Sequence, residues 1–71
     1  MFKIYIHGEI NGDPITLCTG KEYKFVTYMH RVTTEIDGVL LKVDDDKFIV
    51  NIYRGEAYIP FDIVTEIQEI N

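Results

Sequence analysis

The chain has 71 residues, which is enough for one hydrophobic core but too few for two, so residues 1–71 form one small domain. Apolar residues make up 46% and charged residues 27%, an ordinary globular composition that argues against disorder. Twelve acidic against seven basic residues give a net charge of −5, which disfavours non-specific nucleic-acid binding. A domain this small buries only about 60% of its unfolded surface, so a homo-oligomer is a natural source of extra stability.

Cysteine usage and the N-terminal pattern bear on location. The single Cys18 cannot form an internal disulfide, and no apolar run reaches the roughly 20 residues needed to cross a bilayer. Residues 1–7 alternate apolar and polar side chains and lack the features of a signal peptide. We therefore expect a cytoplasmic protein without membrane contact.

In chain order, the first predicted element is a strand in which Phe2, Ile4 and Ile6 share one face. The segment 11–14, Asn-Gly-Asp-Pro, supplies residues that reverse a chain, and a short second strand is expected over 15–19. A further strand over 23–29 follows the break at residues 20 and 21.

The centre of the chain predicts a tight hairpin. Asp37-Gly38 lies between apolar neighbours, the pattern of a two-residue type I′ turn, and pairs Ile36 with Val39. This register leaves Leu40 on the outer face. It assigns six residues to the core face: Val32, Thr34, Ile36, Val39, Leu41 and Val43.

Two more turns continue the same sheet. A loop at 44–47 places Val43 opposite Phe48 and leaves Ile49 on the outer face. It also places Leu41 opposite Val50 and Val39 opposite Ile52. A type II′ turn at Gly55-Glu56 would pair Ile52 with Ile59 and Tyr53 with Tyr58.

The C-terminal segment has two interpretations. Pro60 lacks an N–H and should end its strand or lie on an edge, followed by one tight turn at 61–63 and a last strand over 64–70. The alternative is a terminal helix, because Ile63, Ile67 and Ile70 also follow helical spacing.

The predicted fold class is therefore all-β: five or six short antiparallel strands curled into a small SH3-like or Sm-like barrel. Apolar Leu40 and Ile49 on the predicted outer face favour such curling, or contact with another subunit.

The stretch from Gly38 to Asp44, followed by 58–67, resembles the strand pattern of Sm-like and Hfq-like small barrels over the C-terminal half. In that family a glycine in the second strand permits sharp bending, and an apolar–Asp–loop–Asn pattern builds a uridine pocket on a ring. Gly38, Leu40, Val43 and Asp44 fit this spacing, whereas Phe48 stands where the family places its RNA-contacting Asn. The resemblance implies a ring-forming RNA binder.

No catalytic or metal constellation is visible in the sequence. His7, His30 and Cys18 are too few for a four-ligand zinc site, and the run at 44–46 lacks the spacing of a calcium loop. Cys18 is expected to be a buried small apolar residue, and a domain this size leaves little room for a deep pocket. We expect no enzyme activity and no cofactor.

The most suggestive side chains for binding are tyrosines near arginines, because both residue types are enriched at protein hot spots and also stack on bases. Tyr23 belongs to the same pattern. The candidate binding residues are Tyr28, His30, Arg31, Tyr53, Arg54 and Tyr58.

The function expected from these features is non-enzymatic binding, with a protein as the favoured partner. Asp44, Asp45 and Asp46, together with Glu35 and Glu56, suit an inhibitor or adaptor that occupies a basic site, and such contacts weaken with salt. One alternative is an Sm-like RNA-binding ring with a surface lined by Lys24, Arg31, Lys42 and Arg54. Another is a structural subunit of a larger assembly.

Overall fold

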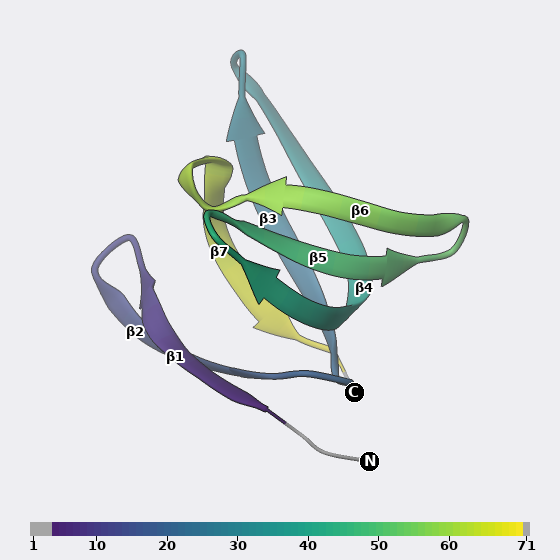
Figure 1. Ribbon diagram of the computed structural model, residues 1–71. Coiled ribbons are helices and arrows are strands. Elements are labelled where there is room, and N and C mark those ends of the chain that lie inside the picture. Colours follow the sequence, from purple (N-terminus) through teal and green to yellow (C-terminus); the bar gives the residue numbers. More distant parts are fainter. Residues whose placement is uncertain (1–3, 71) are drawn as a thin grey trace.

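The computed structural model describes residues 4–70, and in this range the chain is built from β-strands and one 3-10 turn (Figure 1). All strand pairs are antiparallel, which confirms the all-β prediction. Within these residues, no helix is long and apolar enough to cross a membrane. The elements are β1 (Tyr5–Ile10), β2 (Asp13–Cys18), β3 (Glu22–Met29), β4 (Val32–Asp44), β5 (Lys47–Ile52), β6 (Gly55–Pro60), the 3-10 turn η1 (Phe61–Ile63) and β7 (Val64–Glu69).

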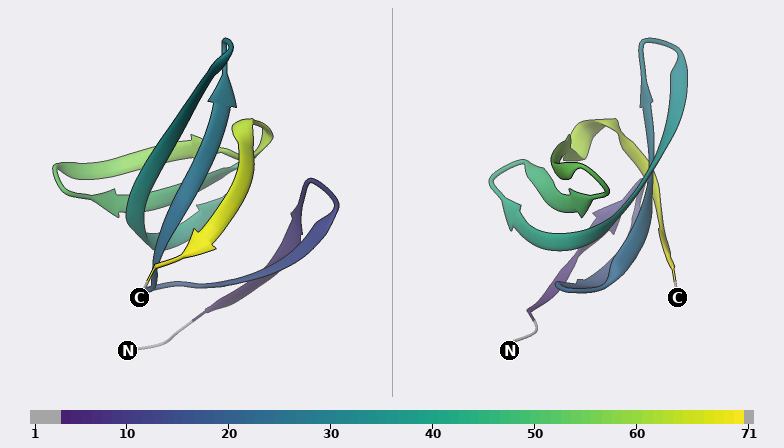
Figure 2. Two further views of the ribbon diagram at one scale, coloured as in Figure 1. Left: turned by 180° about the vertical axis from the view of Figure 1, so that it is seen from behind. Right: turned by 90° about the vertical axis from the view of Figure 1, so that its right-hand side faces the viewer.

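The strands form two sheets. β1 and β2 make a two-stranded sheet, and the other five pair in the order β6-β5-β4-β3-β7. The five-stranded sheet is strongly curled, and the β1–β2 hairpin lies to one side of it (Figures 1 and 2). Among residues 4–70 the edge strands β6 and β7 do not pair, so the sheet is curled but not closed. The described strands number seven rather than five or six.

The β1–β2 hairpin turns where the sequence predicts it. Asn11 and Gly12 both have positive φ, +52° and +83°, as a two-residue type I′ turn requires. The turn closes on the Ile10–Asp13 pair. The prediction for Phe2 lies outside the described residues.

The second hairpin differs from its prediction. The chain reverses at His30-Arg31, and Asp37-Gly38 lies in the middle of the 13-residue strand β4. The predicted turn there is wrong, because Gly38 serves a close approach between strands rather than a reversal. A Cβ at this position would lie 2.9 Å from the backbone oxygen of Asn51. β4 bends sharply, so that one half pairs with β3 and the other with β5 (Figure 1).

A β-bulge in β4 changes the predicted register of the next hairpin. The pair Val43–Phe48 is confirmed, but a shift between Leu40 and Lys42 places Leu40 opposite Val50. Leu41 is thereby 40% exposed, while Leu40 is fully buried. The predicted pairs of Leu41 with Val50 and of Val39 with Ile52 are therefore wrong.

The outer-face assignments of Leu40 and Ile49 are also wrong, because both side chains are buried. The bulge is the physical reason for the burial of Leu40, because one extra residue in a strand reverses which side chains point to each face. Phe48, Ile49 and Val50 are buried in succession, so β5 has apolar contacts on both faces.

The β5–β6 turn lies two residues earlier than predicted. Tyr53 and Arg54 form the turn, and Gly55, with φ +135°, begins β6. Tyr58 therefore lies opposite Ile49, not Tyr53, and Ile59 lies opposite Phe48, not Ile52.

The C-terminal prediction of a strand is confirmed and the helical alternative is wrong. β6 ends at Pro60 on the sheet edge, η1 makes one tight turn, and β7 pairs with β3. The amide of Phe61 donates to the carbonyl oxygen of Asp46 at 2.8 Å, which ties η1 to the β4–β5 turn.

The core lies inside the curl of the large sheet. Among residues 4–70, its largest fully buried side chains are Phe25, Leu40, Val50 and Ile59. Phe48 packs against both Phe25 and Phe61, with ring centroids 5.3 and 4.7 Å apart. Leu17 of β2 joins this cluster, so the hairpin contributes to the same core.

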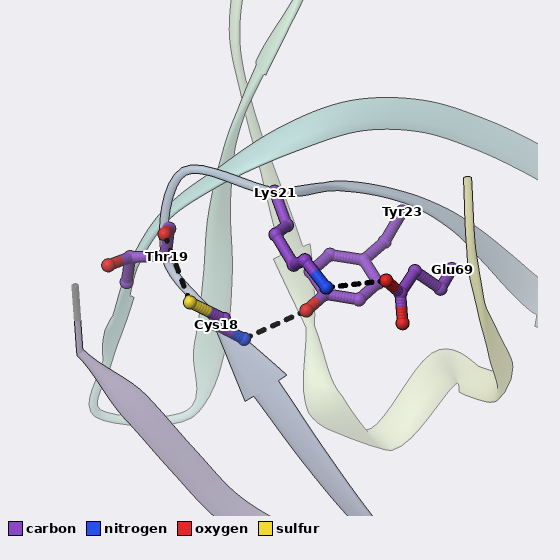
Figure 3. Close-up of polar contacts among 5 residues, drawn as sticks. All are labelled: Cys18, Thr19, Lys21, Tyr23 and Glu69. Atoms are coloured by element: carbon purple, nitrogen blue, oxygen red, sulfur yellow. Dashed lines mark hydrogen bonds and ion pairs between the residues drawn. The ribbon is translucent and has the colours of Figure 1, made fainter. Parts of the chain in front are cut away.

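A buried hydrogen bond joins the two sheets (Figure 3). The Cys18 amide donates to the hydroxyl oxygen of Tyr23 at 2.8 Å, and the nearby Lys21 ammonium lies 2.5 Å from the Glu69 carboxylate. Cys18 is buried, as predicted. Tyr23 is also buried, so it is not part of any exposed tyrosine surface.

Candidate binding surfaces

The turn of the β3–β4 hairpin has an unusual backbone. His30 and Arg31 have φ of +53° and +66°, the left-handed region that a type I′ turn requires at both positions. Asn-Gly is the sequence that adopts this turn most readily, because Gly has no Cβ and the short polar side chain of Asn tolerates positive φ, which most other side chains disfavour. Each non-glycine residue held there costs on the order of 1 kcal/mol or more. Two exposed side chains are therefore retained at a cost in stability.

Apolar side chains flank this turn. Met29 and Val32 lie opposite each other and are 51% and 58% exposed, and Tyr28 on the other face is also exposed. We call residues 28–32 the hairpin tip. Figure 2 shows that the tip extends beyond the rest of the large sheet. The tip thus presents apolar, aromatic and cationic groups together.

The other predicted binding residues lie elsewhere. Tyr53, 98% exposed, and Arg54 form the β5–β6 turn, and Tyr58 is exposed on the neighbouring edge strand. In Figure 1 this end of the sheet points away from the hairpin tip. The structure therefore separates the six predicted residues into two groups of three.

The acidic run forms an ordinary turn. Asp45 and Asp46 connect β4 to β5, and Asp44 lies opposite Lys47 in the closing pair. Lys47 is 4.0 Å from the Asp46 carboxylate. Among residues 4–70, no three His, Cys, Asp or Glu side chains come close enough to hold a metal ion.

Several lysines already have acidic neighbours. Lys24 is 3.6 Å from Glu35, and Lys21 is paired with Glu69. The Glu69 carboxylate, through its hydrogen bond and its charge, raises the pKa of Lys21. These pairs reduce the positive charge available to a polyanion.

A cavity that the sequence analysis did not anticipate lies between β1 and the large sheet. Its volume is about 480 Å³. The lining residues are Ile6, His7, Gly8, Glu9, Ile10, Asn11, Ile15, Leu17, Val43, Phe48, Phe61, Asp62 and Val64. The available signal was Gly8, which shares a strand face with Ile6 and Ile10 and leaves a gap between them. A Cβ at Gly8 would meet nothing within 4 Å.

Cys18 and His7 each have a polar neighbour of their own. The Cys18 thiol lies 3.5 Å from the carbonyl oxygen of Thr19, and His7 Nδ1 lies 3.1 Å from the hydroxyl of Thr16. No family model, curated protein or solved structure matches this chain.

Proposed function

We propose that this protein is a non-enzymatic binding module that contacts a partner protein through the hairpin tip. The observation that carries the proposal is the turn at His30-Arg31. Backbone strain that persists at an exposed position is a recognised mark of functional sites, because stability alone would favour Asn-Gly there.

The chemistry of the tip supports a protein partner. Tyr, Met and Arg are enriched at protein interfaces, and Tyr28, Met29 and Arg31 lie within four consecutive residues. A polyanion is less well matched, because the net charge is −5 and Lys21, Lys24 and Lys47 each have a carboxylate within 4.0 Å.

A regulatory role, in which the protein inhibits or adapts its partner, is part of the same proposal. The exposed acidic residues Asp45, Asp46 and Glu56 would add salt-sensitive attraction to a partner with a basic surface. They lie at or beside other turns of the large sheet, so they would extend the contact rather than replace the tip.

The test replaces the turn with its most favourable sequence. The double variant H30N/R31G keeps the type I′ geometry and removes both side chains, so it should fold at least as stably as the wild type. The wild type and H30N/R31G are each used for affinity capture from the native host, and the captured proteins are identified by mass spectrometry. A partner should be captured by the wild type and not by the variant. Arg54→Ala, which removes an exposed arginine at the other hairpin, is the control and should retain the partner.

Three other results would contradict the proposal. Capture that survives H30N/R31G but is lost with Arg54→Ala would place the site at Tyr53, Arg54 and Tyr58. A salt-resistant ring in light scattering that shifts with oligo-uridine RNA would favour the Sm-like alternative, which stays a prediction. A fixed high oligomer without any captured partner would favour a structural subunit.

A further inference from the structure

The β1 strand has an open edge along the cavity. Within residues 4–70, β1 pairs only with β2; it also approaches β7, but without a strand pairing. The cavity touches five consecutive residues of β1, from Ile6 to Ile10, although alternate side chains of a strand point to opposite faces. Contact with all five means that the cavity follows the edge of the strand as well as its inner face.

The hydrogen-bond pattern of the hairpin identifies the free backbone groups. The Thr19 amide donates to the carbonyl oxygen of Ile4 at 3.0 Å, so this pair is hydrogen-bonded. Antiparallel pairs alternate between bonded and non-bonded, which leaves the amides and carbonyls of Tyr5, His7 and Glu9 directed away from β2.

Two details of β2 fit this alternation. Pro14, which has no N–H, lies opposite Glu9 at a non-bonded position, where the ladder needs no donor from it. The Cys18 amide, opposite Tyr5, donates away from β1 to the Tyr23 hydroxyl. The open edge of β1 is therefore a template for one more strand.

The residues that line the cavity beside this edge suit an added strand with alternating side chains. Inward-pointing groups of an added strand would meet Val43, Phe48 and Phe61, and the gap at Gly8 gives them room. Outward-pointing groups would lie beside Glu9, and Asp62 also lines the cavity. Opposite charges on neighbouring strands attract, so the outward positions favour Lys or Arg.

We infer that the groove between β1 and the β4–β5 side of the large sheet binds an extended segment of a partner protein, with apolar and basic residues in alternation, as an added strand on β1. Main-chain hydrogen bonds to His7 and Glu9 would hold the segment, and the cavity would select its apolar side chains. This site is separate from the hairpin tip, so it can be tested independently of the function proposed above.

The test uses three synthetic hexapeptides with blocked ends and the full chain. One alternates valine and lysine, the second alternates valine and glutamate, and the third is the valine–lysine peptide with alternate backbone nitrogens methylated. By NMR titration at low salt, the first should bind, with shifts in β1, Phe48 and Phe61. The second and third should bind at least tenfold more weakly, because they lack the matching charge or the backbone donors.

Variants of the protein then test the cavity itself. Gly8→Leu fills the gap without meeting any atom within 4 Å of its Cβ, so it should fold normally and lower peptide affinity at least tenfold. The control Thr33→Leu adds the same side chain to an exposed position of β4 and should leave affinity unchanged. H30N/R31G should also leave it unchanged, which separates this site from the tip.

Several outcomes would overturn the inference. Equal binding of the methylated peptide would indicate charge attraction without strand addition. Full affinity in Gly8→Leu would mean that the cavity is not used, and absence of binding by the valine–lysine peptide would refute the chosen occupant. A dimer in light scattering with shifts confined to β1 would show that a second copy covers this edge instead.

Discussion

Gly38 offers the sharpest test of how β4 and β5 pack. In Gly38→Ala the new methyl group would lie 2.9 Å from the Asn51 backbone oxygen and 3.3 Å from Cβ of Val50. Neither atom belongs to the end of a flexible side chain, so β5 would have to shift. Overpacking of this kind costs about 1–3 kcal/mol. The alanine substitution also lowers the conformational entropy of the unfolded chain, which stabilises the folded state by about 0.5–1 kcal/mol.

The net expectation for Gly38→Ala is a loss of about 1–2 kcal/mol, which for a domain of this size lowers Tm by roughly 5–15 °C. Thermal unfolding followed by circular dichroism measures this shift. Gly8→Ala is the matched control, because the same substitution there meets no atom within 4 Å and should raise stability by about 0.5–1 kcal/mol. Equal Tm values for the two variants would refute the close approach of β4 and β5 at Gly38.

Two further predictions concern the joint between the sheets. Tyr23→Phe leaves the buried Cys18 amide without its acceptor and should cost about 1–3 kcal/mol in urea unfolding, whereas Tyr58→Phe, at an exposed position, should change little. Glu69 raises the pKa of Lys21 above its usual 10.5 in the folded state. The ion pair therefore stabilises the folded state fully below pH 10.5, and this stabilisation is lost as the pH rises through the raised pKa of Lys21. The small difference in stability between wild type and Glu69→Gln should therefore be present at pH 9 and shrink above pH 10.5. A difference that does not change with pH would contradict the ion pair of Lys21 with Glu69.

The strand content and the chain reversals at the two ends of the sequence could be predicted because their signals are local. Asn11-Gly12 suits a type I′ turn in any context, and Pro60 cannot continue a central strand. The terminal strand over 64–69 follows from the same alternation of apolar residues.

The middle of the chain could not be predicted from local patterns. Asp37-Gly38 has the sequence of a turn, but tertiary packing uses Gly38 for the approach of Asn51 and places the turn at His30-Arg31, which local propensity disfavours. The bulge beside Leu41 leaves no mark in the sequence, yet it reverses which of two adjacent leucines is buried.

The candidate site was predicted in part. Tyr28, His30 and Arg31 do lie together and exposed, because they occupy one hairpin. Their separation from Tyr53 and Tyr58 depends on the curl of the sheet. The cavity beside β1 depends on how two sheets meet, and only the gap left by Gly8 hints at it in the sequence.

The pairing of β3 with β7 also governs the order in which the molecule can fold. Neighbouring strands from β3 to β6 are joined by two-residue turns, so these hairpins can form from short-range contacts. The pair Tyr23–Glu69, in contrast, joins residues from opposite parts of the chain and requires closure of a long loop. During synthesis the outer edge of β3 therefore stays open until residues 64–69 have left the ribosome, and the last strand completes the sheet.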